Sequence, residues 1–578
     1  MNTSRRVCEV VPVTAVREGS AYKVPRHEAP MDLMLDGNEG KAPPDELLQS
    51  LLRYDNSPIF RYPKTNVLES MLTERLGLSE GQLLVTAGAD DGIDRICRTM
   101  LSEGREVLVP WPTFEMLVRY ASVAGGKVNK VAWTPGTSFP VDDFIAQATE
   151  NTGLLMVVSP NNPTGSVVSP EDIEKLSQAL PHVLILLDLA YVEFADKDLT
   201  YLALSLPNVV VTRTLSKAWG LAGLRVGYAV SNETVIGWLR VAGEPYAVSG
   251  PSMLLAEERL KTGEEEVSAF INFVRNSRTS LESLLSELGN RVIPSQGNFV
   301  FAEVDDSLWL RDAMAGMGIG IRAFPGKPAL EKGVRITSPR NEEQAERLAH
   351  ALRTVYKPEA ILFDMDGVLA DVTPSYRQSI LRTAKFFGVT LEPSDITAFK
   401  EAGNANNDWL VTQALLAERG VEVPLEEVTR VFEEFYQGTD ETPGLWEQEK
   451  LLIEREKLQT LAKSYPLAVV TGRPRADAVR FLEQYDLADC FRLMVCMEDA
   501  PAKPNPEPVE LAMKKLGVST AWMIGDTPDD IRAARGARVL PLGVVASGDD
   551  DEKTGLALVR SGAARILSNP SDIVELVP

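Results

Sequence analysis

The chain has 578 residues, too many for one hydrophobic core, so its length predicts two to four domains. Hydrophobic residues make up 44% and charged residues 24%, which excludes a mainly disordered or fibrous chain. No apolar run approaches the roughly 18 residues of a membrane helix, and the first residues, MNTSRRVCEVVPVTAV, contain no signal-peptide stretch. Four cysteines without metal-ligand spacing indicate reduced thiols, so we expect a cytoplasmic protein.

The net charge of -23 comes from 59 basic and 82 acidic residues. Such a surface repels nucleic acid and anionic membranes, so we expect neither as a partner. It also repels anionic substrates, so any phosphate site needs a few aimed cations and backbone amides. Only three histidines are present and none lies in a motif, so we do not expect catalysis to depend on imidazole.

Short apolar runs alternate with helix-like stretches along almost the whole chain. This pattern predicts an α/β fold with parallel sheets that are covered on both faces. Ligands of such sheets bind beyond the carboxyl ends of the strands, so the residue after each run is a candidate site residue. The runs span 107–109, 154–158, 183–187, 209–211, 360–363, 467–470 and 522–524.

The residues that follow these runs form two groups, separated by a helical stretch at about 341–356 and a short Lys-Pro-Glu link. We therefore predict one domain at 1–356 and another at 357–578. Within the second domain, apolar residues at helical spacing predict a helical insert at about 372–446.

The first group of motifs contains one lysine in a glycine-rich setting. Lys217 lies in TLSKAWGLAGLRVGY, and Asp188 stands at an earlier strand end. The group also contains PNNPTG at 160–165, GAD before an amphipathic helix, and Phe114. In this order the motifs resemble the fold type I pyridoxal-phosphate aminotransferases, and within them the histidinol-phosphate aminotransferase branch, over about residues 20–350.

This resemblance implies two parts within the first domain. A large domain with a parallel or mixed sheet is expected at about 51–249. A small α/β domain is expected from about 1–50 and 250–356.

The resemblance also assigns chemistry to the motifs. Lys217 is expected to form a Schiff base with pyridoxal phosphate and to move a proton at the substrate α carbon. Asp188 is expected to keep the ring nitrogen protonated by charge pairing. Tyr62 is expected to reach the phosphate of a neighbouring subunit, which implies a homodimer through this domain. The other expected cofactor contacts are Phe114, Asn162 and Tyr191 at the ring, and Ala89, Asp90, Thr214, Ser216 and Arg225 at the phosphate.

Substrate contacts are implied in the same way. Arg335 and Arg322 match arginines that hold the substrate anion, a carboxylate for glutamate and a phosphate for a phosphorylated amino compound. Tyr22 and Asn298 are candidates for further contacts. The chain departs from the family at 188–191, where DLAY replaces the usual DEAY, and where Ser-Pro replaces a glycine after the arginine strand. Both departures loosen the assignment to one substrate.

The second group contains four motifs in a fixed order. DMDGV begins at Asp364, TG begins at Thr471, AKP contains Lys503, and GDTPDD ends the series. This order resembles the haloacid-dehalogenase-like hydrolases over about residues 359–578, which implies a Rossmann-like core whose helical insert is a cap. The resemblance assigns Thr471 to the phosphoryl oxygens and Lys503 to the negative charge that develops there.

The carboxylates of this group suit phosphoryl transfer. A carboxylate approaches a phosphate ester only where cations cancel the repulsion. Magnesium, a hard cation with oxygen ligands, suits Asp364, Asp526 and Asp530, together with the main-chain carbonyl of Asp366. Asp364 is the expected nucleophile, and Asp366 is expected to protonate the leaving oxygen and then to activate water.

Together the motifs predict a bifunctional enzyme. One half would transaminate a phosphorylated substrate with glutamate or 2-oxoglutarate, and the other would hydrolyse a phosphate monoester with magnesium. Imidazole acetol phosphate and histidinol phosphate fit best, because their transamination and hydrolysis are consecutive steps of histidine biosynthesis. Two alternatives remain open: an aminotransferase or decarboxylase paired with a phosphatase on another phosphorylated amino compound, and a second half that only senses or assembles. The loop GNANNDW at 403–409 either contacts the leaving group or begins a helix.

Overall fold

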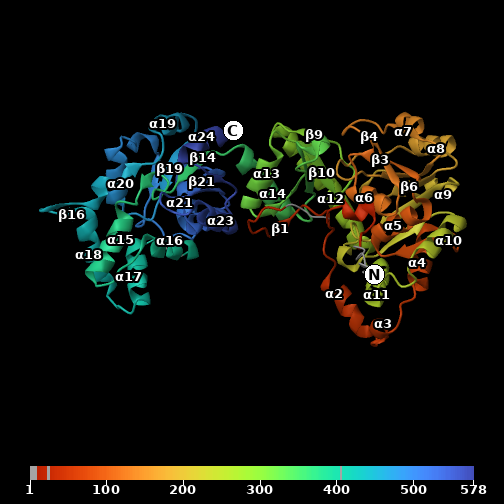
Figure 1. Cartoon of the computed structure of the whole chain (residues 1–578), viewed down its shortest axis with the longest axis horizontal. Coiled ribbons are helices and arrows are strands. Elements are labelled where there is room, and N and C mark those ends of the chain that lie inside the picture. Colours follow the sequence, from red (N-terminus) through yellow and green to blue (C-terminus); the bar gives the residue numbers. More distant parts are fainter. Residues whose placement is uncertain (1–9, 22–25, 404–406) are drawn as a thin grey trace, which may run out of the picture. The chain divides into compact units, whose positions relative to one another are not determined.

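The computed structural model describes residues 10–21, 26–403 and 407–578 (Figure 1). By compactness the chain divides into two units, and each is described by itself. The first comprises Leu35–Ser307, Arg322–Ala345 and the described part of Met1–Pro25; the second comprises Arg26–Met34, Leu308–Ile321 and Glu346–Pro578. Compactness therefore groups some earlier segments with the C-terminal part, and the domain limits drawn from the sequence stay a prediction.

A seven-stranded sheet forms the centre of the first unit, with strand order β2-β8-β7-β6-β5-β3-β4. Only β8 runs antiparallel to its neighbours, and every other neighbouring pair is parallel, so the predicted mixed sheet is confirmed. The strands are β2 (Leu83–Thr86), β3 (Glu106–Trp111), β4 (Lys127–Ala132), β5 (Thr152–Val158), β6 (Leu184–Asp188), β7 (Val209–Thr214) and β8 (Gly227–Val230).

Continuous apolar runs form these strands because both faces of the sheet are buried. Alternate residues of one strand enter different cores: Leu155 and Val157 of β5 belong to one cluster, and Leu154 and Met156 to the other. Helices α5 (Gly88–Met100), α6 (Glu115–Val123) and α10 (Glu233–Ala242) cover the face of Leu154. The face of Leu155 is covered by α4 (Asn66–Leu76), α7 (Val141–Gln147), α8 (Pro170–Ala179), α9 (Thr200–Ser205), α11 (Gly250–Thr262) and α12 (Glu264–Glu287).

A smaller antiparallel sheet completes the first unit, in the order β12-β13-β10-β9. Its buried face includes Ile293, Phe301 and Leu330. The strands are β9 (Arg291–Ile293), β10 (Phe299–Glu303), β12 (Arg322–Ala323) and β13 (Gly333–Thr337), and the short helices α1 (Thr14–Arg17), α2 (Asp45–Gln49) and α3 (Ser57–Phe60) also belong to this unit.

The second unit is built on a six-stranded parallel sheet with the order β20-β19-β14-β21-β22-β23. Its strands are β14 (Ala360–Phe363), β19 (Leu467–Val470), β20 (Leu493–Val495), β21 (Ala521–Gly525), β22 (Leu540–Val544) and β23 (Ile566–Leu567). Its helices include α13 (Ser307–Gly316), α14 (Glu342–Tyr356), α19 (Arg455–Ser464), α20 (Arg475–Gln484), α21 (Glu507–Leu516), α22 (Pro528–Gly536), α23 (Asp551–Ser561) and α24 (Ile573–Leu576).

Helices α13 and α14 contact the sheet of the second unit. The indole N–H of Trp522, a fully buried residue of β21, donates to the Thr354 carbonyl of α14 at 2.6 Å. The Trp309 ring of α13 meets the Trp522 ring edge-on, with 5.6 Å between centroids. Beside them, β1 (Leu33–Met34) pairs in parallel with β11 (Ile319–Gly320).

Over its described residues, the predicted helical insert contains four helices. They gather beside the parallel sheet (Figure 1). They are α15 (Tyr376–Phe386), α16 (Pro393–Ala402), α17 (Asp408–Glu418) and α18 (Leu425–Gln437). The chain enters the insert through β15 (Ala370–Asp371) and leaves it through β18 (Lys450–Leu451), and these two strands pair antiparallel. A small ribbon of β16 (Gly438–Thr439) and β17 (Thr442–Pro443) follows α18.

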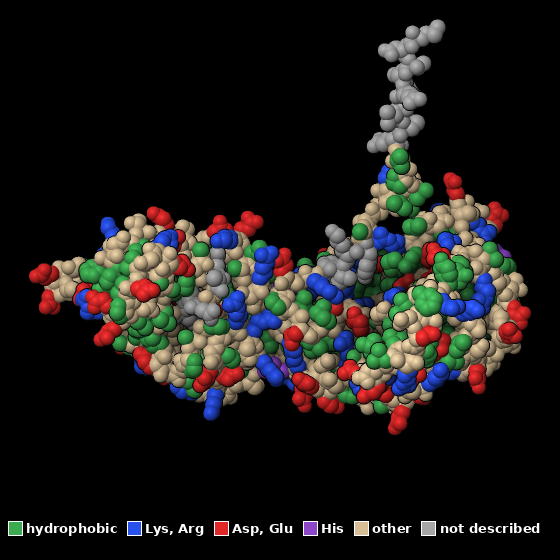
Figure 2. All heavy atoms as spheres, turned by 90° about the horizontal axis from the view of Figure 1, so that it is seen from below, with side chains coloured by type: hydrophobic (Ala, Val, Ile, Leu, Met, Phe, Trp, Pro, Cys, Tyr) green, Lys and Arg blue, Asp and Glu red, His purple; other side chains and the backbone are tan. Residues whose placement is uncertain are grey.

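Basic and acidic side chains are mixed over the surface (Figure 2), although the net charge of the chain is -23. Lysines and arginines are scattered among acidic side chains over the described part of the face in Figure 2, without a continuous basic patch there. Among the described residues, no helix is both long and apolar enough to cross a lipid bilayer.

Candidate functional sites

Two adjacent strand ends of the large sheet carry the predicted cofactor residues. Asp188 is the last residue of β6, and Lys217 lies in the loop after β7. Asp188 is buried and accepts a hydrogen bond from Thr212 Oγ1 of β7 at 3.1 Å. Burial raises the pKa of Asp188 to about 7, and the Thr212 hydrogen bond lowers it by less. A cation beside this carboxylate would restore its ordinary ionisation, and a protonated pyridine nitrogen is such a cation.

The Lys217 amine lies beside a buried polar cluster. Its Nζ donates to the Gly37 carbonyl at 3.4 Å and lies 5.6 Å from the centre of the Tyr191 ring. The Tyr191 hydroxyl accepts a hydrogen bond from Asn38 Nδ2 at 3.2 Å. Asn298 Nδ2 in turn donates to the Asn38 carbonyl at 3.1 Å. The structure therefore brings Lys217, Tyr191 and Asn298 together around residues 35–39, LDGNE.

The predicted phosphate contacts form a cradle at the start of α5. Arg225 has a left-handed backbone, with φ of 52°, and its Nη2 lies 2.8 Å from Asp90 Oδ2 while its Nη1 lies 3.4 Å from Ser216 Oγ. Thr214 Oγ1 donates to Ser216 Oγ at 2.8 Å. A Cβ at Gly88 would lie 2.6 Å from Arg225 Nη2, so glycine there allows the guanidinium to approach the helix start. The amides of α5, including that of Ala89, can bind an anion beside it.

The two predicted substrate arginines are register partners. Arg322 of β12 lies opposite Arg335 of β13, and both are buried. Arg335 Nη1 donates to Asn162 Oδ1 at 2.6 Å, and its Nη2 donates to the Asp36 carbonyl. Within the described residues, Arg322 Nη1 has no hydrogen-bond partner. The pair therefore provides buried positive charge with a nitrogen ready for an anion, next to the predicted ring contact Asn162.

The remaining predicted contacts lie farther out. Tyr62 is 78% exposed and stacks on Tyr246, with 4.6 Å between ring centroids. Phe114 precedes α6 and packs half-buried against the sheet core. Tyr22 lies outside the described residues. A role for Tyr62 at a neighbouring subunit and for Phe114 on the cofactor ring stays a prediction.

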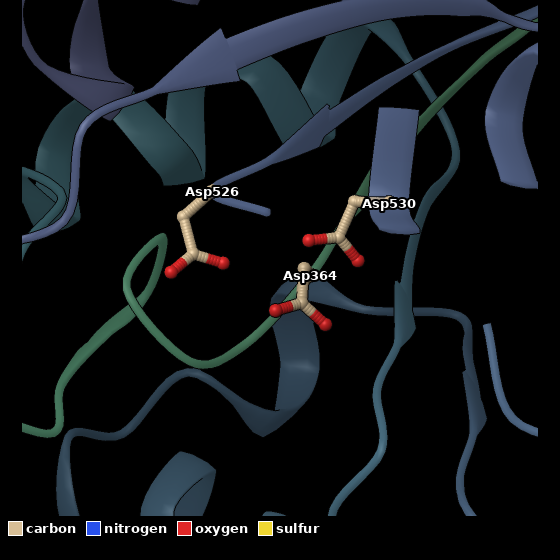
Figure 3. A group of neighbouring side chains, drawn as sticks. All are labelled: Asp364, Asp526 and Asp530. Carbon is tan, nitrogen blue, oxygen red and sulfur yellow. The ribbon is translucent and has the colours of Figure 1, made fainter. Parts of the chain in front are cut away.

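Three carboxylates converge at strand ends of the second unit (Figure 3). Asp364 follows β14, Asp526 follows β21, and Asp530 lies in the first turn of α22. One oxygen of each lies within 4.8 Å of those of the other two, and all three are buried. Burial raises the pKa of Asp364 and of Asp526, and the neighbouring carboxylates raise both further. A divalent cation would reverse this effect.

One lysine lies among these acids. Lys503 Nζ donates to Asp364 Oδ1 at 2.6 Å, to Asp530, and to the Val470 carbonyl at 3.1 Å. The carboxylates raise the pKa of Lys503 although burial lowers it, so the amine stays a cation. Lys503 thus has the position expected of the residue that offsets nucleophile and phosphoryl charge.

The acidic group fits a metal with oxygen ligands. Asp526 Oδ1 is buried and has no hydrogen-bond partner within the described residues. Asp530 has less free capacity to bind a metal, because its Oδ2 already accepts hydrogen bonds from the Thr527 amide and hydroxyl in a capping box. A Cβ at Gly367 would lie 2.2 Å from Asp526 Oδ2, so only glycine lets the loop after β14 approach so closely. The carboxylate of Asp366 lies outside the group of three, and its predicted contribution was the main-chain carbonyl.

The predicted acid and phosphoryl donor lie beside a residue that sequence reasoning missed. Thr471 Oγ1 accepts from the Arg473 amide at 3.1 Å, which leaves the hydroxyl proton to donate to a ligand. Arg473 Nε donates to Asp366 Oδ1, and Nη1 donates to Glu449 Oε2 at 2.9 Å. Arg473 follows Thr471-Gly472 directly, and that proximity was the available signal.

The described end of the cap loop is a helix start. Asn407 Oδ1 accepts from the amides of Trp409 and Leu410 at the beginning of α17. The Trp409 indole donates to Glu433 Oε1 of α18 at 3.0 Å. These contacts support the helix-start interpretation for 407–409, whereas 404–406 lie outside the described residues.

The fold and the sites together define an enzyme with an amine-based cofactor site and an aspartate-based phosphohydrolase site. The model of the family "Aminotransferase class I and II" matches residues 34–352, and that of "haloacid dehalogenase-like hydrolase" matches residues 358–538. The chain belongs to the class I and II aminotransferases, and its C-terminal part belongs to the haloacid dehalogenase-like hydrolases. Both family predictions are confirmed.

Curated relatives and solved structures are similar to this chain in the aminotransferase part as well. The chain is 32% identical over 321 residues to the histidinol-phosphate aminotransferase of Thermoanaerobacter pseudethanolicus, which covers 55% of this chain and 88% of that protein. It is 43% identical over 237 residues to an imidazoleglycerol-phosphate dehydratase of Phytophthora nicotianae. This match covers 38% of this chain, and the chain spans about half, 52%, of that relative's length. The structure of histidinol-phosphate aminotransferase from Sinorhizobium meliloti with pyridoxal 5'-phosphate matches with a TM-score of 0.51 and 25% sequence identity. The match covers 56% of this chain and 90% of that one.

The families fix the cofactors. Class I aminotransferases use pyridoxal phosphate, and haloacid-dehalogenase phosphatases use Mg²⁺, so these are the cofactors of the two parts. The side chains fit both groups. Lys217, buried Asp188 and the cradle of Arg225 suit pyridoxal phosphate, and the carboxylates of Asp364 and Asp526 suit Mg²⁺.

Proposed function

We propose that the aminotransferase part interconverts imidazole acetol phosphate and histidinol phosphate with glutamate and 2-oxoglutarate. The hydrolase part then cleaves histidinol phosphate to histidinol and phosphate with Mg²⁺. The observation that carries this proposal is the buried pair Arg322 and Arg335, which suits an anionic substrate group such as a phosphate. The names of two relatives, histidinol-phosphate aminotransferase and imidazoleglycerol-phosphate dehydratase, both denote imidazole-bearing alkyl phosphates and support the assignment.

In the aminotransferase site, each side chain has a separate task. Pyridoxal phosphate supplies an aldehyde that forms imines and a ring that accepts electrons. Lys217 Nζ would hold the cofactor covalently and, when free, would move a proton at the substrate α carbon. Asp188 holds the proton on the ring nitrogen by its negative charge. Arg335 and Arg322 hold the substrate anion, and the cradle at Arg225 holds the cofactor phosphate.

In the hydrolase site, two steps conserve atoms and charge. An oxygen of Asp364 attacks phosphorus while the bond to the leaving oxygen breaks, and that oxygen takes its electron pair and a proton from Asp366. Asp366, now a carboxylate, takes a proton from water, whose oxygen attacks phosphorus. The bond to Asp364 then breaks, and its electron pair returns to the carboxylate. Lys503 offsets the negative charge, and Thr471 donates to a phosphoryl oxygen. Mg²⁺ held by Asp364 and Asp526 would supply further positive charge there.

The proposed active unit of the aminotransferase part is a homodimer. Tyr62 is exposed in one chain, as a residue that reaches a neighbouring site must be. Large apolar side chains of the same unit are exposed as well, among them Leu48, Leu52, Ile59, Phe60, Trp238 and Val241. A dimer in sedimentation velocity supports this assembly, and a monomer that is fully active contradicts it.

The function is tested by incubating the protein with histidinol phosphate, 2-oxoglutarate and Mg²⁺ while glutamate and phosphate are measured separately. We expect both products. Lys217→Ala should abolish glutamate formation and the near-visible absorbance of lysine-bound cofactor, while phosphate release continues. Asp364→Asn should abolish phosphate release, while glutamate formation and the near-visible absorbance remain. Release of carbon dioxide instead of glutamate would favour a decarboxylase, and unchanged phosphate release by Asp364→Asn would refute the hydrolase assignment.

A further inference from the structure

Arg473 is a fully buried arginine bound on every nitrogen. Its Nε donates to Asp366 Oδ1, its Nη1 to Glu449 Oε2 at 2.9 Å, and its Nη2 to Glu449 Oε1 at 3.3 Å. The guanidinium lies 4.9 Å from the centre of the Tyr376 ring and 5.5 Å from that of Phe481. Only 1% of the side chain is exposed. Carboxylates at the edge and rings around it leave this planar group one orientation.

Glu449 connects this arginine to the cap. Its Oε1 accepts from Ser375 Oγ at 2.7 Å and from the Tyr436 hydroxyl at 3.3 Å. Ser375 precedes α15, and Tyr436 lies in α18, so both belong to the helical insert. Glu449 itself directly precedes β18, the strand through which the chain leaves the cap. The orientation of Arg473 thus depends on the seating of the cap.

Asp366 is the exposed end of this chain of contacts. Its side chain is 24% exposed, whereas that of Glu449 is 2% exposed. Within the described residues, Arg473 supplies the only hydrogen bond to the Asp366 carboxylate. A carboxylate held through one oxygen keeps the other for proton transfer. Without Arg473, no other described donor would fix its rotamer.

We propose that Arg473, oriented by Glu449 and the cap, is a positioning residue that aims Asp366 at the leaving oxygen and then at the attacking water. The proposal rests on the hydrolase function and adds to it a residue that acts through Asp366. A direct phosphate contact is the competing role. The burial of Arg473 and the bond that each of its nitrogens makes to a carboxylate argue against that role, because a phosphoryl group would have to compete with Asp366 and Glu449.

The leaving group separates the two roles. An alkyl phosphate needs Asp366 in both steps, first as acid and then as base. p-Nitrophenyl phosphate needs it only in the second, because nitrophenolate departs without a proton. Misplacing Asp366 should therefore slow both steps with the alkyl ester but only the second step with the aryl ester. General acid–base catalysis contributes about 100- to 10,000-fold, which bounds the expected loss.

The experiment uses the full chain with Arg473→Lys and with Glu449→Gln, loaded with Mg²⁺. With histidinol phosphate, kcat should fall by about 100-fold or more while KM changes by less than about 3-fold. With p-nitrophenyl phosphate, a rapid burst of about one nitrophenol per chain should precede slow turnover. Asp366→Asn should show the same pattern, and the double variant Arg473→Lys/Asp366→Asn should lose no more than Asp366→Asn alone.

Controls separate failure of this inference from failure of the hydrolase function. The natural protein must first release phosphate from both esters, and Asp364→Asn must release none. Arg480→Lys is the matched control, because Arg480 likewise lies over an aromatic ring, that of Tyr436, and pairs with a carboxylate, that of Asp477. Its kcat should stay unchanged. An unchanged far-ultraviolet circular dichroism spectrum reports that each variant is folded. A KM for both esters and a Ki for inorganic phosphate that rise together, with no burst, would overturn the proposal, as would an unchanged kcat.

Discussion

Arg322 and Arg335 lie directly opposite each other across β12 and β13, although only 7% and 8% of these residues is exposed. Opposite residues of an antiparallel pair place their side chains on the same face, where like charges are unfavourable. Such an arrangement persists where a ligand supplies negative charge. Arg335 is already bound to Asn162 and to the Asp36 carbonyl, so Arg322 is the arginine with more capacity for a ligand.

Replacing Arg322 by glutamine should therefore weaken substrate binding more than cofactor binding. Loss of a charge-assisted hydrogen bond costs about 1.5–3 kcal/mol, so KM for the phosphorylated substrate should rise by about 10- to 150-fold. Steady-state kinetics with glutamate fixed measures this change. Arg291→Gln is the control, because Arg291 is an exposed residue of β9 that pairs with Glu303. This variant should leave KM unchanged. Equal KM values in both variants would remove Arg322 from the substrate site.

For the arginine pair, the sequence predicted the role of the side chains but not their position opposite each other. Both arginines were assigned to the substrate by resemblance, but their register could not be predicted. β12 contains only Arg322 and Ala323, which is too short to produce an alternating pattern. The strand-end rule worked better for Asp364, because a buried parallel strand is a continuous apolar run that stops at the site.

The Asp188→Asn variant should show a pH-dependent difference in stability. In the cofactor-free protein the pKa of Asp188 is raised to about 7 by burial, whereas an unfolded aspartate titrates near 3.9. Protonated Asp188 therefore stabilises the fold fully below about pH 4, and this contribution is lost as the pH rises through about 7. The denaturation midpoint of the natural protein minus that of Asp188→Asn should fall between pH 4.5 and 8. A difference in denaturation midpoint that stays constant across this pH range would contradict a raised pKa of Asp188.

Asp526→Asn should raise the Mg²⁺ concentration that the hydrolase needs. Its Oδ1 is buried without a hydrogen-bond partner among the described residues, and it offers the most available ligand oxygen. Losing one charged ligand should increase the half-saturating Mg²⁺ by about 10-fold or more, because a second-shell change alone costs about that much. Titration of phosphate release with Mg²⁺ measures this. Asp551→Asn, in the exposed acidic run, should leave the titration unchanged.

Trp522→Phe tests the packing of α14 on the parallel sheet. The variant keeps an aromatic ring but leaves the Thr354 carbonyl without the indole donor at 2.6 Å. An unpaired buried acceptor costs about 1–3 kcal/mol. The temperature at which phosphatase activity is lost irreversibly should fall by several degrees, whereas Trp238→Phe, which is 48% exposed, should not change it. Equal inactivation temperatures would mean that the hydrogen bond adds no stability.

The contact between Arg473 and Glu449 in the second site could not be predicted from the sequence. The four motifs located Asp364, Thr471 and Lys503, because each follows a strand or lies in a recognisable loop. Glu449 has no local signal, since it lies outside every motif and reaches Arg473 only after the cap has folded. Its partnership depends on packing between segments far apart in the chain, which one sequence does not display.

The most direct test of two sequential sites on one chain is phosphate release from imidazole acetol phosphate with Mg²⁺, measured with and without glutamate. We predict rapid release only with glutamate, because the amino compound must form first. We also predict that Lys217→Ala releases no phosphate until histidinol phosphate is supplied. Release at the same rate without glutamate, or from Lys217→Ala given imidazole acetol phosphate alone, would contradict it.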